Sequence, residues 1–305
     1  MRWLLRLLIA MLLLSVLGLG IFLGPAHLQI RNIAPPLPTE ADLRALATVP
    51  GGPISIRVVQ SSSQIGPSRT LGHTAVVIQW PDGRSFMIDA AMDRQASEDF
   101  GELVAKLSPN MEPVAFHGTT PELLGETINS IEGVGFTHLH IDHVQGVDAF
   151  CDARGQGARV YQTPWQAEEH NLHTKDSARQ LESSCLEQLV LEGEGGLITM
   201  SKFPGLGIVA LGGHTPGSTL FAVHVDGTLW LMSGDISNVK SNLLTNTDKG
   251  WLYSNIMVPE NTARTEELRL WLAALDRQQN TEVIVAHDFA AALASGMLRL
   301  QTGYQ

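Results

Sequence analysis

One short segment of this sequence concentrates side chains that bind metal ions. Residues 137–143 place three imidazoles and one carboxylate within six positions, at His138, His140, Asp142 and His143. Alternate side chains of an extended segment point to the same side, so we expect His138, His140 and Asp142 to share a side, with His143 following in a turn. Imidazole and carboxylate bind zinc and related cations. Composition does not explain the pattern, so we predict a metal site rather than a polar surface loop.

Four further candidate donors lie elsewhere in the chain, each next to a strand-like segment. His214 stands in the glycine-rich run GGHTPGS, Asp235 ends LMSGD, His287 ends VIVAH, and Asp89 ends FMID. Taken singly, each could be a structural histidine or a turn-forming aspartate. Their order along the chain, with Asp89 before H-x-H-x-D-H and the other three after it, gives them weight together.

The H-x-H-x-D-H signature and the order of these segments resemble the metallo-β-lactamase superfamily. The resemblance implies an α/β fold, the αββα sandwich of two mixed sheets flanked by helices. It also implies two metal sites. The first would be held by His138, His140 and His214, and the second by Asp142, His143 and His287, with Asp235 between the two metals and Asp89 orienting a ligand histidine from behind.

The chemistry that this resemblance implies is metal-dependent hydrolysis. Two divalent ions, zinc by default with iron or manganese as alternatives, would share a hydroxide that serves as the nucleophile. One metal would polarise the substrate carbonyl, and Asp142 would help to orient the nucleophile or move a proton. No serine or cysteine nucleophile is then required.

Several reactions remain open, because this fold hosts many chemistries. The leading hypothesis is hydrolysis of a small ester-like bond, above all a lactone of the acyl-homoserine type, since H-x-H-x-D-H with Asp235 is the pattern of the lactonase-like and thioesterase-like branches. A β-lactamase is the second: export and GHTPGST favour it, whereas Ile236 stands where that subclass usually has serine. Thioester, phosphate ester and sulfate ester hydrolysis also remain.

A different class of protein is a diiron oxidoreductase or an inactive binding domain. Diiron relatives usually carry glutamate at the second histidine of the signature, where this chain has His140. An inactive binder would lack ligands, and none is missing here. Both readings are therefore disfavoured.

Charge and composition restrict the partners. The chain has 305 residues, of which 44% are hydrophobic, and its formal net charge is −11. This composition excludes a disordered protein, and the negative charge disfavours a nucleic-acid partner. We expect a small-molecule substrate; the patterns assign no substrate-binding residue and no oligomeric state.

The N-terminus predicts export. Arg2 and Arg6 precede an uncharged stretch from Leu7 to Leu23, which as a helix spans roughly 25 Å, slightly less than the ~30 Å hydrocarbon core. Residues 1–26 are either a signal peptide cleaved near residue 26 or a membrane anchor formed by residues 3–23. Both place the rest of the chain outside the cytoplasm, in the periplasm if the source is a Gram-negative bacterium. Cys151 and Cys185 could then form a disulfide, or remain two thiols.

The remaining chain divides into a tether and a catalytic domain. Residues 27–53 form a Pro-rich tether in which Thr39 caps a short helix, and residues 54–305 form the domain. Hydrophobic patterns predict helices over 121–131 and 263–278, and a hairpin turn at residues 81–83. Strands are predicted over 54–60, 74–80, 85–90, 158–162, 207–213, 218–225, 228–234 and 282–287.

Other conspicuous side chains have no motif around them. His170 and His173 either rim a pocket or lie on a solvated face, whereas His27, His73, His117 and His224 are interpreted as structural, and Tyr161 receives no role. Substrate choice is expected to depend on the loops at 60–70 and 240–262. In the second loop, Trp251, Tyr253 and Met257 line an apolar pocket or serve as ordinary packing.

Overall fold

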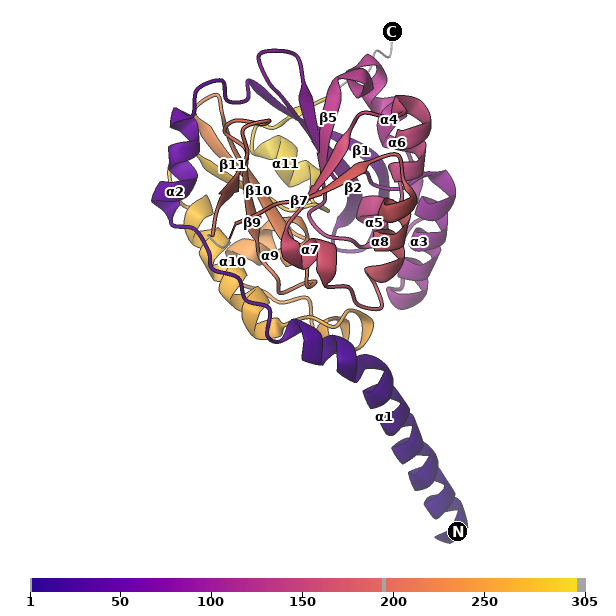
Figure 1. Cartoon of the computed structure of the whole chain (residues 1–305). Coiled ribbons are helices and arrows are strands. Elements are labelled where there is room, and N and C mark those ends of the chain that lie inside the picture. Colours follow the sequence, from indigo (N-terminus) through magenta and orange to yellow (C-terminus); the bar gives the residue numbers. More distant parts are fainter. Residues whose placement is uncertain (1, 194–195, 301–305) are drawn as a thin grey trace.

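Two mixed β-sheets pack face to face in the domain (Figure 1). The computed structural model describes residues 2–193 and 196–300. The larger sheet has the order β13 (Leu298–Arg299), β1 (Ser55–Ile65), β2 (Thr70–Gln79), β3 (Ser85–Ile88), β5 (Ile131–Gly135), β6 (Arg159–Gln162) and β7 (Glu187–Val190), with β4 (Ala115–Phe116) paired to β1. The smaller sheet has the order β12 (Thr281–Ile284), β11 (Thr228–Met232), β10 (Thr219–Val225), β9 (Gly207–Ala210) and β8 (Ile198–Thr199).

Both sheets combine parallel and antiparallel pairs, as the resemblance implied. Strands β1 to β3 are antiparallel, and β3, β5, β6 and β7 are parallel. In the smaller sheet only β11 and β12 pair in parallel. The predicted fold class of two mixed sheets flanked by helices is therefore confirmed.

Alternating side chains of the strands fill three apolar layers. In β2, Val76 and Ile78 join the core between the sheets, and Ala75 and Val77 join the core beneath the outer helices. In β10, Phe221 faces the other sheet and Leu220 faces away from it. A period of two in the sequence thus builds both faces of each sheet.

Helices close the outer faces of the two sheets (Figure 1). Those beside the larger sheet are α3 (Arg94–Leu107), α4 (Thr120–Leu124), α5 (Ile141–Val144), α6 (Val147–Arg154) and α8 (Lys175–Ser183). Those beside the smaller sheet are α2 (Glu40–Ala45), α9 (Lys240–Leu244) and α10 (Thr262–Asp276), with α7 (Pro164–Glu168) and α11 (Phe289–Ala294) near the sheet ends. The described residues also include four short helical turns: η1 (Leu46–Thr48), η2 (Gly125–Ser130), η3 (Gly234–Ile236) and the π-helical η4 (Tyr253–Met257).

Most predicted elements are present, and one predicted helix is wrong in its extent. The predicted helix over 121–131 ends at Leu124, because Gly125 takes a φ of 52° and a 3₁₀ turn follows. Ile131 already belongs to β5, where it pairs with Ser85. The helix predicted over 263–278 is confirmed as α10, and Thr39 forms a capping box with Asp42 at the start of α2.

The N-terminal helix leaves the domain as a long rod (Figure 1). This helix, α1 (Arg2–Ile30), has 29 residues and a mean hydropathy of 2.7 in its most apolar stretch, so its length and composition allow it to cross a membrane. Leu23, Ala26 and Ile30 near its end are buried. The chain that follows lies on the domain, with Ile33 and Leu43 buried. The boundaries at residues 26 and 53 stay predictions.

Cys151 and Cys185 form a disulfide in this structure. Their Cα atoms are 5.6 Å apart, and the bond ties α6 to the segment that enters β7. The Cys185 N–H also points to Cys151 Sγ at 3.1 Å. Of the two alternatives left open for these cysteines, the structure has the bonded one.

Candidate metal centre

The signature segment changes conformation in its middle. It leaves β5 as an extended chain through His140, and α5 then begins at Ile141. His138 and His140 therefore converge as predicted, but Asp142 does not share their alternation. The expectation that all three lie on one side is wrong, because the helical turn carries Asp142 and His143 to a neighbouring point in space.

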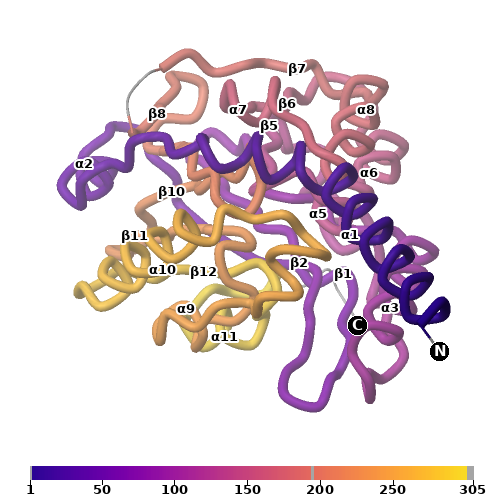
Figure 2. The backbone as a smooth tube through the Cα atoms, turned by 90° about the horizontal axis from the view of Figure 1, so that it is seen from below, coloured from indigo at the N-terminus to yellow at the C-terminus, as the bar shows by residue number. Residues whose placement is uncertain are grey.

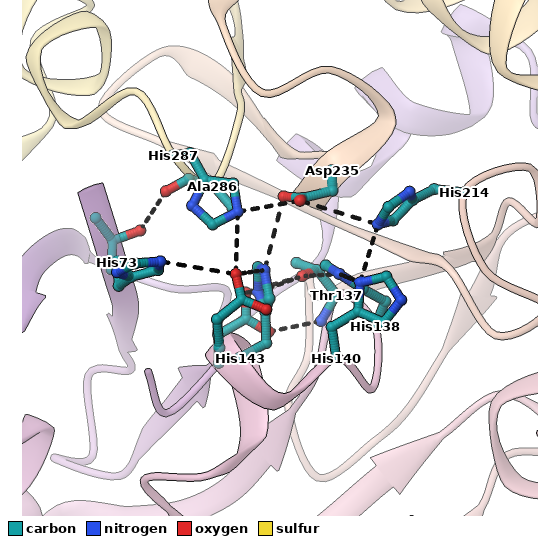
Figure 3. A network of polar contacts seen from close by, with 12 residues as sticks. His73, Thr137, His138, His140, His143, His214, Asp235, Ala286 and His287 are labelled. Atoms are coloured by element: carbon teal, nitrogen blue, oxygen red, sulfur yellow. Dashed lines mark hydrogen bonds and ion pairs between the residues drawn. The ribbon is translucent and has the colours of Figure 1, made fainter. Parts of the chain in front are cut away.

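Three histidines form a first cluster of donors (Figure 3). His138 Nε2 lies 3.0 Å from His140 Nδ1, and His214 Nε2 lies 3.2 Å from the same atom. His214 reaches this point because Gly212 and Gly213 take φ values of 64° and 84° in the loop after β9. The three side chains could hold one metal ion.

A second cluster lies beside the first and is built from acids and histidines. His287 Nε2 is 3.3 Å from Asp142 Oδ2 and 3.0 Å from Asp235 Oδ2. His143 Nε2 is 3.7 Å from Asp142 Oδ2 and 3.6 Å from Asp235 Oδ1. Asp235 Oδ2 is also 3.9 Å from His214 Nε2, so this carboxylate lies between the two clusters (Figure 3).

Asp235 enters the site from a sharp turn at the end of β11. Gly234 there has a φ of 57°, and a Cβ on it would come within 2.6 Å of Thr137 Cβ. Only glycine fits this contact without a shift of the signature segment. The local sequence Ser-Gly-Asp therefore brings a strand end against the segment that carries His138.

Partners behind the cluster fix the orientation of two histidines. His143 Nδ1 donates to Asp89 Oδ2 at 2.9 Å, and His287 Nδ1 donates to the Gly72 carbonyl at 2.8 Å. Asp89 also accepts from the Thr137 N–H at 2.8 Å. Each bond leaves the Nε2 atom of its histidine facing the centre, which is how outer hydrogen bonds set the tautomer of metal-binding histidines.

His214 is held by a buried network that the sequence patterns do not reveal. Its Nδ1 lies 2.5 Å from Glu260 Oε1, and Ser254 Oγ donates to Glu260 Oε2 at 2.5 Å. Lys249 Nζ contacts Glu260 Oε1 at 2.9 Å and also the Asp235 carbonyl. Burial alone would raise the pKa of Glu260, but Lys249 and the bonds from His214 and Ser254 lower it to about 2.

Burial and charge divide the histidines of the cluster into two kinds. Burial, followed by the charges of neighbouring histidines, holds the pKa of His138 and of His140 well below the usual range, so both are neutral. Burial also opposes the charged form of His143, yet Asp89 and Asp142 raise its pKa to about 10. Neutral imidazole is the form that binds metal, so binding at His143 must release a proton.

His73 also reaches the second cluster, although no motif singled it out. It lies in β2, and its Nε2 is 3.7 Å from Asp142 Oδ2. His73, Asp142 and His287 form a further set of donors close enough to hold a metal ion. Burial and then the charge of His287 lower the pKa of His73 to about 3.

A cavity of about 650 Å³ opens from this cluster. His140, Asp142, Asp235 and His287 lie at its polar end. Its apolar wall is formed by Leu71, Phe100, Leu103, Val104, Leu107, Met257 and Val258, and its other lining residues include Arg69, His173, Asn238, Lys249 and Tyr253.

Some of the side chains left open by the sequence now have a place. His173 lines the cavity, whereas His170 bonds to the Ala167 carbonyl. In the second loop Tyr253 and Met257 line the cavity, while Trp251 is 70% exposed outside it.

Comparison with known families covers the segments that carry the candidate metal ligands. Residues 69–287 match the sequence model of the Lactamase_B family, the metallo-beta-lactamase superfamily. This chain belongs to the metallo-β-lactamase superfamily. A search of curated protein sequences finds no match to it.

Solved structures of the superfamily share the fold at low sequence identity. A variant of AiiA from B. thuringiensis with N-decanoyl-L-homoserine at its active site is 13% identical, with a TM-score of 0.57 over 80% of this chain and 96% of that one. A probable metal-dependent hydrolase from Staphylococcus aureus is 16% identical, with a TM-score of 0.55 over 77% and 90% of the two chains. The dizinc quorum-quenching lactonase AidC is 13% identical, with a TM-score of 0.52 over 78% and 90%.

The donor set fits the divalent metals of the superfamily. Among the described residues, His73 Nε2, His143 Nε2 and Asp235 Oδ1 are buried without a hydrogen-bond partner. Buried polar atoms without partners are costly, and these three belong to sets of donors that could each hold a cation. The family and this His/Asp cluster together support a dinuclear metal-dependent hydrolase.

Proposed function

We propose that this protein hydrolyses a small ester-like bond, with an acyl-bearing lactone such as an acyl-homoserine lactone as the leading substrate. One observation carries the proposal: a single cavity has metal donors at one end and an apolar wall along α3. A reactive polar ring and an apolar chain would match these two ends. The fold shared with AiiA and AidC supports the same substrate class.

The residues divide into two metal sites and their supports. His138, His140 and His214 would hold one ion, and Asp142, His143 and His287 would hold the other, with Asp235 between the two sets and Asp89 behind His143. Two divalent ions, zinc by default, would supply an activated water and polarise the substrate carbonyl. Asp142 would orient the attacking group and accept its proton.

Tyr253 is the residue best placed to bind the substrate carbonyl. It lines the cavity, and burial together with the charges of Asp235 and Glu260 raises its pKa well above the usual range. The phenol therefore keeps its proton and can donate a hydrogen bond to a substrate oxygen.

The function is tested with full-length protein in detergent, supplied with zinc, by measuring the acid that substrate hydrolysis releases. Homoserine lactones of several acyl lengths, a β-lactam, a thioester, and a phosphate and a sulfate ester are compared, each with and without a chelator. Chelator-sensitive turnover of lactones, rising with acyl length, is expected. Preference for the β-lactam, or turnover of only one of the other esters, would replace the proposal by that activity.

Two variants test the metal mechanism directly. His140→Ala and Asp142→Ala each remove one donor, so turnover should fall by at least about 1,000-fold while the melting temperature of the metal-free protein changes little. Turnover close to that of the unaltered protein in either variant would contradict a dinuclear mechanism. Glu102→Ala, an exposed change on α3, is the control.

We also propose that α1 is retained as an anchor that holds the domain outside the cytoplasm. Arg2 and Arg6 at its start favour a cytoplasmic N-terminus, and its apolar residues are mostly exposed. Protease added outside the inner membrane should degrade the domain, and N-terminal sequencing of the membrane fraction should begin before residue 26. A mature protein that begins near residue 27 would establish a cleaved signal peptide instead.

A further inference from the structure

His73 is a buried histidine with one ring nitrogen satisfied and the other aimed at the metal centre. Only 3% of its surface is exposed. Its Nδ1 lies 3.0 Å from Ser62 Oγ on the adjacent strand β1, and this contact orients the ring. Its Nε2 has no hydrogen-bond partner among the described residues and faces Asp142 Oδ2 at 3.7 Å.

The backbone around His73 is joined to the last predicted ligand. The Gly72 N–H donates to the His287 carbonyl at 3.1 Å, and His287 Nδ1 donates to the Gly72 carbonyl at 2.8 Å. Thr74 Oγ1 donates to the Ala286 carbonyl at 2.8 Å. The start of β2 and the loop after β12 are therefore fixed to each other, which holds His73 beside His287 (Figure 3).

The spacing suits coordination of one ion. Two neighbouring donors that each lie about 2.1 Å from one ion are roughly 3.0 Å apart in octahedral and roughly 3.4 Å apart in tetrahedral coordination. Asp142 Oδ2 is 3.3 Å from His287 Nε2 and 3.7 Å from His73 Nε2. We propose that His73 is a direct ligand of the ion held by Asp142 and His287, additional to the residues that the signature supplies. The inference rests on the metal centre of the proposed function, and not on its substrate.

A matched pair of variants tests this role. His73→Gln removes the nitrogen donor, and His117→Gln is the control. His117 contacts Ser63 of β1 at 2.9 Å, much as His73 contacts Ser62 of β1, but it lies outside the donor sets. Metal content is measured after dialysis, and metal affinity is measured by competition with a chelator. In His73→Gln, one ion should remain tightly bound and the affinity for the second should fall at least tenfold. The control should retain two.

Spectroscopy separates a ligand from a residue that only supports Asp142. In the cobalt-substituted protein, His73→Gln should change the absorption of the second ion and lower its count of imidazole donors. His73→Cys should add a sulfur-to-cobalt charge-transfer band, which a supporting role cannot produce. Two tight ions with an unchanged spectrum in His73→Gln, or no such band in folded His73→Cys, would overturn the proposal. Failure of lactone turnover alone would overturn only the substrate assignment.

A second, independent observation concerns the mouth of the cavity. Leu103 and Leu107 on α3 and Ile141 on α5 line the cavity and are each about half exposed. Trp251 and Leu252, just before η4, are 70% and 60% exposed. Large apolar side chains of α3, of α5 and of the segment before η4 are thus exposed, which is unfavourable in water, and those of α3 and α5 line the cavity.

The end of α1 docks onto the same loops. His27 Nε2 lies 3.0 Å from the Asn255 carbonyl in η4, and Gln29 Nε2 donates to the His170 carbonyl at 3.2 Å. Figure 1 shows α1 leaving the domain on its lower side, and Figure 2 looks at the domain from that side, with α1 in front. Because Leu23, Ala26 and Ile30 are buried, no free linker separates the apolar helix from the domain.

We infer that this face rests on the lipid bilayer and that the cavity opens toward it. The inference rests on the anchor and on the proposed function, and it specifies the substrate as an amphiphile that partitions into lipid. Leu103, Leu107 and Trp251 would enter the headgroup region, where apolar and aromatic side chains are favourably buried.

The test uses full-length protein in phosphatidylcholine nanodiscs that contain a spin-labelled lipid. Both native cysteines are in the disulfide, so a fluorophore can be attached to one added cysteine, in Trp251→Cys or in the control Ala41→Cys on exposed α2, far from the departing part of α1 (Figure 1). Quenching is expected at position 251 and not at 41. Equal, weak quenching at both positions would overturn the inference, and this readout does not depend on which substrate is turned over.

Discussion

At the residue scale, the cluster depends on groups that never contact the substrate. His143, His214 and His287 are held through Nδ1 by Asp89, Glu260 and the Gly72 carbonyl. Each partner keeps Nε2 facing the centre, so the orientations of the rings are already set before an ion arrives. Substitution of these partners should therefore lower the affinity for metal before it affects other properties.

Glu260→Gln is expected to lower the affinity of the site proposed at His138, His140 and His214 for its metal ion by about 10- to 100-fold. The amide loses the charge that pairs with Lys249 and the strong acceptor that holds His214. Competition with a chelator of known affinity measures the effect. Glu267→Gln, which alters an ion pair between the exposed Glu267 and the buried Arg264, is the control, and equal affinities in the two variants would contradict the role of Glu260.

Glu260 also predicts how stability changes with pH in the metal-free protein. Its pKa is lowered to about 2 in the folded protein from an ordinary 4.5, so it stabilises the fold above about pH 4.5 and that contribution is lost as pH falls toward 2. A shift of this size corresponds to about 3 kcal/mol. Urea unfolding between pH 7 and 3 should show a steeper loss for the unaltered protein than for Glu260→Gln; parallel curves would refute the assignment.

At the element scale, the sequence predicted what periodicity and local motifs encode. Strand alternation in residues such as Val76 to Ile78, and the four donors of one segment, are local patterns, and the structure brings those donors together. The helix α3 was missed although Asp93 caps its start and its apolar residues follow a helical pattern, whereas the donor His73 was missed because no local motif surrounds it. Glu260 reaches His214 across 46 positions, and His73 reaches His287 only through the pairing of a hairpin with a C-terminal loop. Such contacts are set by tertiary packing.

The disulfide is the element-scale feature with the clearest effect on stability. It closes a loop of 34 residues between α6 and the start of β7, for which the chain-entropy estimate is about 3–4 kcal/mol. Urea unfolding with and without a reductant should show a difference of this order. In the double variant Cys151→Ser with Cys185→Ser, the reductant should have no effect; a reductant effect that persists there would point to another cause.

At the scale of the whole molecule, α1 is part of the folded domain as well as a candidate membrane span. A chain that begins at Gly24 keeps Ala26 and Ile30 against the domain, and one that begins at Arg31 loses both. The shorter chain should be less stable by about 1–3 kcal/mol, because Ile30 is fully buried. Urea unfolding of the two chains in the same buffer measures this, and equal stabilities would show that the docking contributes nothing.

The hydrogen bonds between Gly72 and His287 join points 215 residues apart, and the other predicted ligands come from three segments between them. Ions bound there would hold the two ends of the domain together and stabilise its fold, because ligands that bind only the folded state add their binding energy to its stability. If the domain lies outside the cytoplasm, as we propose, the supply of divalent metal would set its lifetime against proteases as well as its rate. Scarcity of metal would remove the enzyme rather than merely silence it.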